Sequence, residues 1–462
     1  MYGGYTYLEL DYEPDKTNDI IVLHWVSGRE SIEKLAEALA AESSVGTWTE
    51  LKTINTDVFE NLRARVFRID KVSENSGFVW LAYPLGHFDV KNLLQILASI
   101  RGNVYGLDEL TALIFLDIYF PEKLQKQFSG PAIGLNGVRK RIGTDKDGRP
   151  HIGTIVKPKV GLAPKEWAQV AYEAYLGGID FVKEDENLVD QPFCPWNERV
   201  DAVLEVVDKI KSETGRAVLY SPNITDRYSK MLERIDYLKE AGWDVAMLDV
   251  YMIGYGGLIE IVEHLHKNKF IIHAHRAGHT AEDRGEFGCS FSVFAKLWRL
   301  IGVDQLLTGT GIGKMEGAPA IVRRYADICR EQHLEEALHL LSLEYKWDDN
   351  IKPVMPVASG GINAGLVDGL VQIFGKDIVI QAGGGIHGHP DGTVAGARSL
   401  RCAMEGVMEG ISSPEKAEEC PELKAALDKW GYVEPEGIRK KFDFSEENKD
   451  SLLKELFEKG YR

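Results

Sequence analysis

Cysteines, long apolar runs and basic residues are all scarce in this sequence. Only five of its 462 residues are cysteines, and no CxxC pair occurs among them. A cysteine framework is therefore not expected, and reduced thiols in a cytoplasmic protein fit best. The sequence contains no run of about 18 apolar residues without charge, and its first residues show neither a basic start nor an apolar signal core. We expect no membrane association.

Negative charge dominates, because 71 acidic residues face 54 basic ones and the net charge is −17. Nucleic acid is therefore not an expected partner, since backbone phosphates are bound by clustered Lys and Arg. A small anionic substrate remains compatible with a locally basic site. Hydrophobic residues make up 44% of the chain, which is typical of a soluble globular protein, and the length predicts two domains.

One pattern repeats eight times within residues 136–412, where we place the larger domain. Each unit has a short β-rich apolar run, a polar or glycine-rich loop and an amphipathic helical stretch. The apolar runs are GTIVKPK, GIDFVKED, AVLYSPN, DVAMLDV, KFIIHAH, DQLLTGT, PVMPVAS and DIVIQAG. Eight such units predict a (β/α)₈ TIM barrel. A doubly wound open sheet is the alternative, less favoured because no early dinucleotide-type glycine loop is present.

Residues 1–135 mix strand-like runs (DIIVLHWV, FVWLAYPL) with helical ones (SIEKLAEALAAE, VKNLLQILASI). This mixture predicts a separate N-terminal α+β domain of the ferredoxin-like type. We expect the linker to the barrel near GVRKRIGTDKDGRPHIG, which is rich in glycine and charge. Residues 413–462 contain PEKAEECPELKAALDKW and SEENKDSLLKELFEKGYR, and these charged amphipathic stretches predict a C-terminal helical extension.

Polar residues gather at the ends of the predicted barrel strands, which is where barrel enzymes place their reacting groups. Burying unpaired charges there would cost several kcal/mol, so these residues must bind each other or a ligand. We therefore expect an active site at this end of the barrel. The residues are Lys157, Lys159, Lys183, Asp185, Glu186, Ser221, Asn223, Asp249, His273, His275, Arg276, Thr308, Ser359 and Gln381.

The second predicted strand, within DFVKEDEN, carries the sharpest pattern. Strand alternation points Lys183 and Asp185 to one face, and Glu186 turns inward at the strand end. Two adjacent carboxylates form a hard-oxygen site that suits Mg²⁺. A lysine ammonium has no acceptor and is a poor metal ligand, so a plain Lys–Asp ion pair is the structural alternative. If CO₂ carbamylated the amine, Lys183 would become a third carboxylate-like ligand.

This motif and several others resemble one enzyme family. GGIDFVKEDEN is similar to the GGxDFxKxDE metal motif of the ribulose-1,5-bisphosphate carboxylase/oxygenase large subunits, or RuBisCO. AAESSVGTWTE, GNVYG, TIVKPKVGL, HAHRAGH, GTGIGKMEG, PVASGG and QAGGGIHGHPDG also stand in the family's order over nearly the whole chain. The phrases IYFPEKL and RLIGVDQL resemble the archaeal, form III lineage. In that lineage the enzyme is implied to consume bisphosphate that arises from nucleotide breakdown, such as that of AMP.

The resemblance implies a reaction and its cofactors. Ribulose 1,5-bisphosphate would be carboxylated to 3-phosphoglycerate through an enediolate, with O₂ as a competing substrate. Lys183 would be carbamylated by CO₂ and would bind Mg²⁺ together with Asp185 and Glu186. The carbamate would also be the general base that enolises the sugar.

The resemblance assigns catalytic roles to other positions as well. Lys157 would move protons at the intermediate, and its neighbour Lys159 would tune it electrostatically. His275 would be a second acid/base group. Lys314, on the glycine-bounded segment GTGIGKMEG, would close over the site and stabilise the new carboxylate.

Phosphate binding is implied for Arg276, whose guanidinium offers a bidentate fork. Glycines permit close approach of a phosphate to backbone N–H groups. The remaining substrate-binding positions of the barrel are Ser359, Gly360, Gly361, Gln381, Gly383 and Gly384. The first domain would contribute residues that complete the site of a neighbouring subunit, which implies a homodimer or a higher homo-oligomer. These residues are Glu42, Thr47, Trp48 and Asn103.

Two positions depart from the family pattern. Leu307 stands where the family has a histidine that helps to hold the distal phosphate, and the hydroxyl of Thr308 can compensate in part. Gly278, in HRAGH, replaces a bulkier apolar residue. Two alternatives therefore stay open: a RuBisCO-like enolase or isomerase that acts on a related sugar phosphate without carboxylation, and a non-catalytic metabolite-binding protein. The presence of Lys314 and of the metal residues argues against both.

Overall fold

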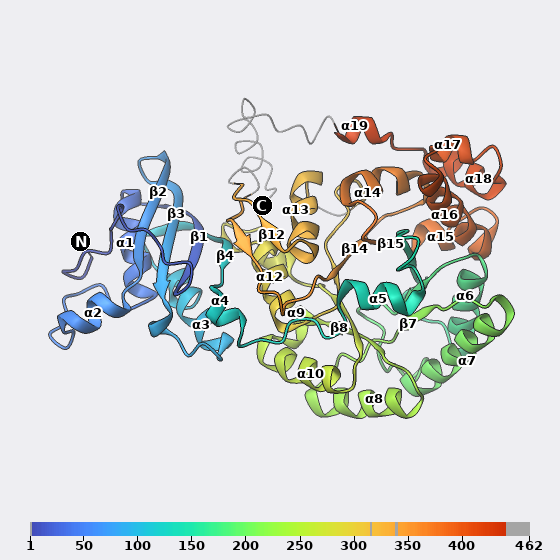
Figure 1. The fold of residues 1–462 in the computed structure, drawn as a ribbon, viewed down its shortest axis with the longest axis horizontal. Coiled ribbons are helices and arrows are strands. Elements are labelled where there is room, and N and C mark those ends of the chain that lie inside the picture. Colours follow the sequence, from blue (N-terminus) through green and yellow to red (C-terminus); the bar gives the residue numbers. More distant parts are fainter. Residues whose placement is uncertain (1, 315–316, 338–340, 440–462) are drawn as a thin grey trace.

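Two parts of the chain lie side by side in the computed structural model, which describes residues 2–314, 317–337 and 341–439 (Figure 1). A sheet with helices, drawn in blue, is built mainly from the N-terminal part of the chain, and a barrel of strands follows it. The predicted α+β domain followed by a barrel is thereby confirmed. None of the helices within these described ranges is long and apolar enough to cross a membrane.

The first sheet has the ferredoxin-like order. The elements follow one another as β1–α1–β2–β3–α3–β4, and the antiparallel order across the sheet is β4–β1–β3–β2. Val22 and Val26 of β1 pack in one core with Leu35 and Leu39 of α1, because each element has one apolar face. The elements are β1 (Asp19–Gly28), α1 (Ile32–Glu42), α2 (Thr56–Leu62), β2 (Arg65–Ser73), β3 (Ser76–Pro84), η1 (Leu85–His87), α3 (Leu93–Ile100), η2 (Asn103–Gly106), β4 (Leu110–Tyr119) and α4 (Glu122–Gln125).

A short strand from the barrel region extends this first sheet. β10 (Phe287–Cys289) pairs in parallel with β4, and Gly288 lies in register with Ile114. The hydroxyl of Tyr105, in η2, donates to the carbonyl of Gly288 at 2.7 Å. The N-terminal domain is therefore tied to the barrel region through a shared sheet, which periodicity alone did not indicate.

Eight parallel strands form the barrel, in the order β7–β6–β5–β15–β14–β11–β9–β8. A bridge between Asn223, just beyond β7, and Met247 of β8 joins the two ends of this order. All eight predicted strands are present, and the ring favours the barrel over the open-sheet alternative. The strands are β5 (His151–Ile155), β6 (Phe181–Lys183), β7 (Leu219–Ser221), β8 (Val245–Asp249), β9 (Ile271–His275), β11 (Gln305–Leu307), β14 (Met355–Ser359) and β15 (Val379–Ala382).

Helices between the strands cover the outside of the barrel (Figure 1). In α6, Trp167, Ala171 and Ala174 are buried, as expected for an amphipathic helix with one apolar face. The long helices are α6 (Pro164–Leu176), α7 (Trp196–Thr214), α8 (Tyr228–Glu240), α10 (Tyr255–Lys267), α12 (Phe291–Ile301), α13 (Pro319–Arg330), α14 (Val367–Phe374) and α16 (Gly392–Glu409). Shorter elements are α9 (Val250–Ile253), α11 (Thr280–Asp283), β12 (His333–Leu334), β13 (Tyr345–Lys346), η4 (Ala364–Leu366) and α15 (Gly384–His387).

Part of the predicted linker is helical. Its segment GVRKRI belongs to α5 (Gly134–Ile142), in which Val138 and Ile142 are buried. Arg139 turns inward and pairs with Asp377 at 2.6 Å. The expected linker is therefore helical over GVRKRI, and its charges there belong to an amphipathic helix.

The C-terminal extension begins with α17 (Ser413–Lys416), α18 (Pro421–Trp430) and α19 (Pro435–Arg439). The second predicted tail helix, SEENKDSLLKELFEKGYR, lies outside the described residues. Cys402 of α16 and Cys420, directly before α18, form a disulfide. The expectation of reduced thiols is wrong for this pair, because the packing of α18 on α16 brings together two cysteines that no sequence motif relates. The free cysteines, all buried, are Cys194, Cys289 and Cys329.

Candidate active site

Lys183 lies at the carboxyl end of β6 and is almost fully buried. Its Nζ donates to the backbone carbonyl of Glu184 at 3.0 Å and lies 3.6 Å from Met247 Sδ. Strand alternation sends Glu184 the other way, where Arg199 of α7 donates to its carboxylate at 2.5 Å. This buried ion pair fixes the backbone between Lys183 and Asp185. This ion pair was not predicted from the sequence. A carboxylate between two inward-facing residues must point outward, which could have indicated a cationic partner there.

Burial lowers the pKa of Lys183 to about 8, although the nearby carboxylates of Asp185, Asp249 and Glu186 favour the ammonium form. The cause is that the amine has left water while its hydrogen-bond partners in the described structure are neutral groups. In a substantial fraction of the molecules, Lys183 is therefore a neutral amine near pH 8. That form carries the lone pair that nucleophilic addition requires.

Two lysines that follow β5 pair with the two carboxylates that follow β6. Lys157 Nζ lies 2.6 Å from Asp185 Oδ2, and Lys159 Nζ lies 2.7 Å from Glu186 Oε1. Burial acts to raise the pKa of Asp185, but its hydrogen bond with Glu186 and the charges of Lys183 and Lys157 lower it. Burial and then Asp185 raise the pKa of Glu186. Asp185 therefore keeps its negative charge, whereas its neighbour Glu186 is more readily protonated.

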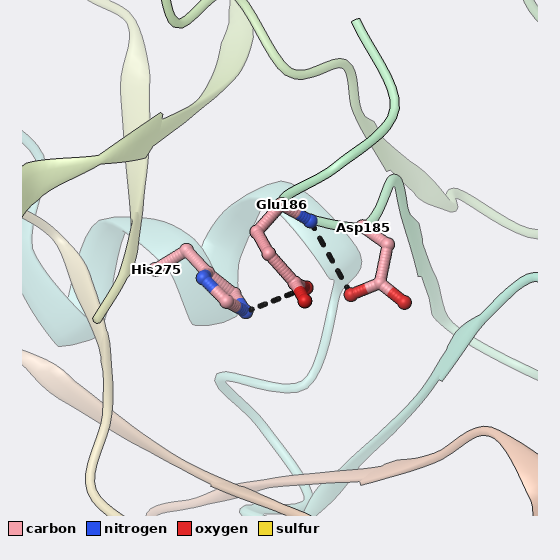
Figure 2. A group of neighbouring side chains, drawn as sticks. All are labelled: Asp185, Glu186 and His275. Carbon is pink, nitrogen blue, oxygen red and sulfur yellow. Dashed lines mark hydrogen bonds and ion pairs between the residues drawn. The ribbon is translucent and has the colours of Figure 1, made fainter. Parts of the chain in front are cut away.

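His275, the last residue of β9, lies beside this carboxylate pair, and Figure 2 shows its ring next to the Glu186 side chain. Ligand atoms of Asp185, Glu186 and His275 all lie within 4.8 Å of one another. His275 Nε2 is 3.7 Å from Glu186 Oε2, and its Nδ1 is 2.9 Å from Asp249 Oδ1. Burial lowers the pKa of His275 well below its usual value and raises the pKa of Asp249 to about 6. A neutral imidazole beside a carboxyl group suits proton transfer.

Glycines allow two backbone segments to approach the lysines closely. The Lys314 N–H donates to the Gly360 carbonyl at 3.1 Å, and a Cβ on Gly361 would lie 2.7 Å from Lys314 Cγ. A Cβ on Gly383 would lie 3.0 Å from Lys157 Cε. The predicted lid lysine, which is exposed, therefore lies against the SGG segment, and Lys157 lies against the QAGGG segment.

Arg276 directly follows β9 and lies next to the first glycine of the predicted lid. Its Nη1 is 3.1 Å from His279 Nε2, and a Cβ on Gly309 would lie 3.0 Å from its Nη2. The hydroxyl of Thr308 is buried, and no hydrogen-bond partner for it occurs among the described residues. Leu307 adds a buried apolar side chain to this region. A largely buried guanidinium with an unpaired hydroxyl nearby is chemically suited to an anion such as phosphate.

Two family models match the chain. Residues 135–430 match the ribulose bisphosphate carboxylase large chain, catalytic domain, and residues 6–124 match its N-terminal domain. The chain belongs to the ribulose bisphosphate carboxylase large-chain family. A ribulose bisphosphate carboxylase of Methanocaldococcus jannaschii is 44% identical over 429 residues, which cover 92% of this chain and 99% of the relative. One of Thermococcus kodakarensis is 41% identical over 435 residues, which cover 93% and 97%.

Solved structures of the carboxylase family agree with this placement. A crystal structure of archaeal ribulose 1,5-bisphosphate carboxylase/oxygenase has a TM-score of 0.88 at 40% identity, and covers 93% of this chain and 100% of that one. The dimeric enzyme of Hyperthermus butylicus has a TM-score of 0.85 at 39% identity, with 92% and 99% covered. The octameric enzyme of Pyrococcus horikoshii, in complex with sulfate, has a TM-score of 0.83 at 38% identity, with 92% and 96% covered. The predicted likeness to the archaeal lineage is confirmed.

The N-terminal residues of the carboxylase motifs lie apart from the cluster around Lys183. Glu42 ends α1, Thr47 and Trp48 follow in the loop before α2, and Asn103 begins η2. Trp48 is 76% exposed. Among the residues described, no hydrogen bond or ion pair joins any of these four to the strand ends of the barrel. The contacts of the described residues therefore do not join these four positions to the chain's own barrel site.

The predicted polar positions Ser359, Gln381 and His273 differ in burial. Ser359 ends β14 and is half-buried, whereas its register partner Gln381 on β15 is fully buried inside the barrel. Both polar atoms of the Gln381 side chain lack a hydrogen-bond partner within the described ranges. His273 is also fully buried, and its Nδ1 lies 3.0 Å from Gln305 Oε1. Gln381 and His273 are thus enclosed in the barrel interior, while Ser359 remains accessible at its mouth.

Proposed function

We propose that this chain carboxylates D-ribulose 1,5-bisphosphate to 3-phosphoglycerate and, with O₂ in place of CO₂, oxygenates it. The observation that carries the proposal is the buried amine of Lys183 beside Asp185 and Glu186 at the strand ends of the barrel. A barrel that only bound a metabolite would not need a lysine of lowered pKa next to two carboxylates. The family match over both domains supports the same reaction.

The residues around Lys183 fit a carbamate and a magnesium ion. The neutral amine would form an N–C bond to CO₂ and release one proton, which leaves a carbamate with two oxygen ligands. The carbamate, Asp185 and Glu186 would hold Mg²⁺, which prefers oxygen ligands. Bound there, Mg²⁺ would polarise the oxygens of the sugar. Lys157 and Lys159 pair with the same carboxylates in this structure, and both would become available to substrate when the ion takes their place.

Proton transfer would fall to three side chains at the strand ends. The proton on the substrate's C3 carbon would pass to Lys183 in its carbamylated form. His275, a neutral imidazole with its Nε2 toward Glu186, would exchange a proton with a substrate hydroxyl. Lys157 Nζ, held near Gly383, would donate the proton that completes the second product molecule.

The substrate's phosphates would be bound at two places. Arg276 and Ser359 would hold one phosphate, and backbone N–H groups of Gly383 and Gly384 would hold the other. Lys314 lies on a glycine-bounded segment and is exposed in this structure. It would move over the site and place a positive charge near the carboxylate that forms when CO₂ adds.

We propose a homodimer as the smallest active assembly. Related structures are dimeric in Hyperthermus butylicus and octameric in Pyrococcus horikoshii. Trp48 is exposed, and Asn103 lies apart from the chain's own barrel site, so both are available to the barrel of a second copy. The N-terminal domain of one chain would then complete the site of its partner.

The test is to follow enolisation and carboxylation separately in the wild type and in Lys314→Ala. Enolisation is measured as exchange of the C3 proton of the bisphosphate with solvent, and carboxylation as CO₂-dependent formation of 3-phosphoglycerate. The wild type should do both, and Lys314→Ala should keep exchange but lose carboxylation, because the lysine meets charge that develops only after CO₂ adds. A wild type that exchanges the proton or isomerises a sugar phosphate without fixing CO₂ would establish the enolase or isomerase alternative instead.

A further inference from the structure

A polar network outside the site joins the Asn103 loop to the barrel. Arg101, directly after α3, pairs through Nη2 with Oε2 of Glu282 in α11. The other carboxylate oxygen, Oε1, accepts a hydrogen bond from the hydroxyl of Tyr251 in α9 at 2.6 Å. The side chains of Arg101 and Glu282 are only 17% and 28% exposed, so solvent screens their attraction less than at an open surface.

On one side, this network fixes the loop that carries Asn103. Arg101 stands two residues before Asn103, and its N–H ends α3 by donating to the Leu97 carbonyl at 2.9 Å. Two residues after Asn103, the hydroxyl of Tyr105 donates to the carbonyl of Gly288 at 2.7 Å. The loop is therefore fastened to residues 282–288 on both sides of Asn103, which leaves Asn103 exposed between two anchors.

On the other side, the network fixes the segment that carries Arg276. The Glu282 N–H donates to the His279 carbonyl at 3.0 Å. His279 in turn contacts Arg276 twice. Nδ1 of His279 lies 2.8 Å from the carbonyl oxygen of Arg276, and Nε2 of His279 lies 3.1 Å from the Arg276 guanidinium. A displacement of Glu282 would therefore also shift His279 and, through it, the guanidinium of Arg276, which is proposed to bind a phosphate.

We infer that Arg101 and Glu282 are positioning residues that hold the Asn103 loop and the Arg276 segment in one geometry. The inference rests on the proposed function, in which Asn103 belongs to the partner's site and Arg276 to the chain's own site. One ion pair then sets the substrate contacts of two different active sites. Loss of the ion pair should weaken bisphosphate binding at both active sites, although neither Arg101 nor Glu282 contacts the substrate.

The variant Glu282→Gln tests this inference with little change of shape, because the amide oxygen can still accept from Tyr251. The matched control is Glu213→Gln on the outer face of the barrel. Glu213 also accepts from a tyrosine hydroxyl, that of Tyr172 at 3.0 Å, and it also faces a cation, Lys209 at 3.9 Å. Glu282→Gln should raise KM for the bisphosphate about fivefold while kcat changes less, and Glu213→Gln should leave both unchanged.

A double-variant cycle separates positioning from a general loss of structure. Arg101→Gln should have an effect similar to that of Glu282→Gln, and the double variant should be no worse than either single one, since both remove the same ion pair. Additive effects on KM, or a KM that equals the wild-type value in Glu282→Gln, would overturn the inference. The comparison requires an active wild type, so an inactive wild type would refute the proposed function itself and is a distinguishable result.

Hybrid dimers test whether one pair acts on two sites. A dimer of one Asn103→Ala chain and one Lys183→Ala chain has a single complete site, built from the barrel of the first chain and the loop of the second. Glu282→Gln in the second chain can affect that site only through the Asn103 loop. In the first chain it can affect the site only through Arg276. We expect KM to rise in both placements. A rise in only one placement, or inactive hybrids despite confirmed subunit exchange, would overturn the two-site assignment.

Discussion

The pH dependence of activation follows from the position of Lys183. The proposed activation by preincubation with CO₂ and Mg²⁺ would require the neutral amine, and burial lowers the pKa of Lys183 to about 8. About 9% of the side chains are then neutral at pH 7, about half at pH 8 and about 91% at pH 9. The rate of activation should therefore rise about fivefold from pH 7 to pH 8 and less than about twofold from pH 8 to pH 9. An unshifted lysine would give about tenfold at each step.

The assay is the time course of carboxylase activity after CO₂ and Mg²⁺ are added at each pH, with all turnover measured at one common pH. A matched perturbation is Asp249→Asn. The charge of Asp249 favours the ammonium form of Lys183, so its removal should move the half-maximal pH of activation downward. A rate that climbs tenfold per pH unit up to pH 9, or full activity without preincubation, would refute the account of Lys183.

Three further predictions concern single side chains. Lys183→Ala and Lys183→Arg should both abolish turnover, because neither a methyl group nor a permanent guanidinium adds CO₂, and full activity in either would contradict the assigned role. Leu307→His should lower KM for the bisphosphate about tenfold or more, since a charge-assisted hydrogen bond contributes roughly 1.5–3 kcal/mol. A wild type that binds the bisphosphate no worse than this variant would show that Leu307 does not weaken binding. Cys402→Ser should lower the free energy of unfolding by about 3 kcal/mol in denaturant titrations, because the disulfide to Cys420 closes a loop of 18 residues, and equal midpoints would contradict this.

Local periodicity was sufficient to predict the core of the site. Lys183 is the last residue of β6 and Asp185 lies two residues beyond it, so continued alternation predicted both on one face. The eight strands of the barrel could likewise be predicted, because each strand and helix has its own apolar pattern over a few residues. A charged residue can stand either in a solvent-exposed segment or in a helix with a distant ion-pair partner, and local pattern does not distinguish the two. Arg139 pairs with Asp377, which is half-exposed and lies 238 residues away in the sequence, so the charges of this segment did not predict the helix α5.

Contacts between distant residues account for the features that the sequence did not predict. Arg101 and Glu282 are 181 residues apart, and neither belongs to a recognisable motif. β10 joins β4 although its own segment, FGC, is too short to predict a strand. Asp249 stood among the polar strand ends, but its 2.9 Å approach to His275 depends on the order of β8 and β9 in the barrel. Such contacts require the tertiary arrangement, which composition and spacing do not contain.

The most direct test of the proposed function is to supply ¹³C-labelled CO₂ with ribulose 1,5-bisphosphate to the preactivated enzyme and to analyse the products. With O₂ excluded, we expect each bisphosphate consumed to yield two molecules of 3-phosphoglycerate, one of which carries the label in its carboxylate. Lys183→Ala should give no labelled product. Consumption of the bisphosphate without incorporation of label, or turnover of a different sugar phosphate alone, would contradict the proposal that this site carries out carboxylation.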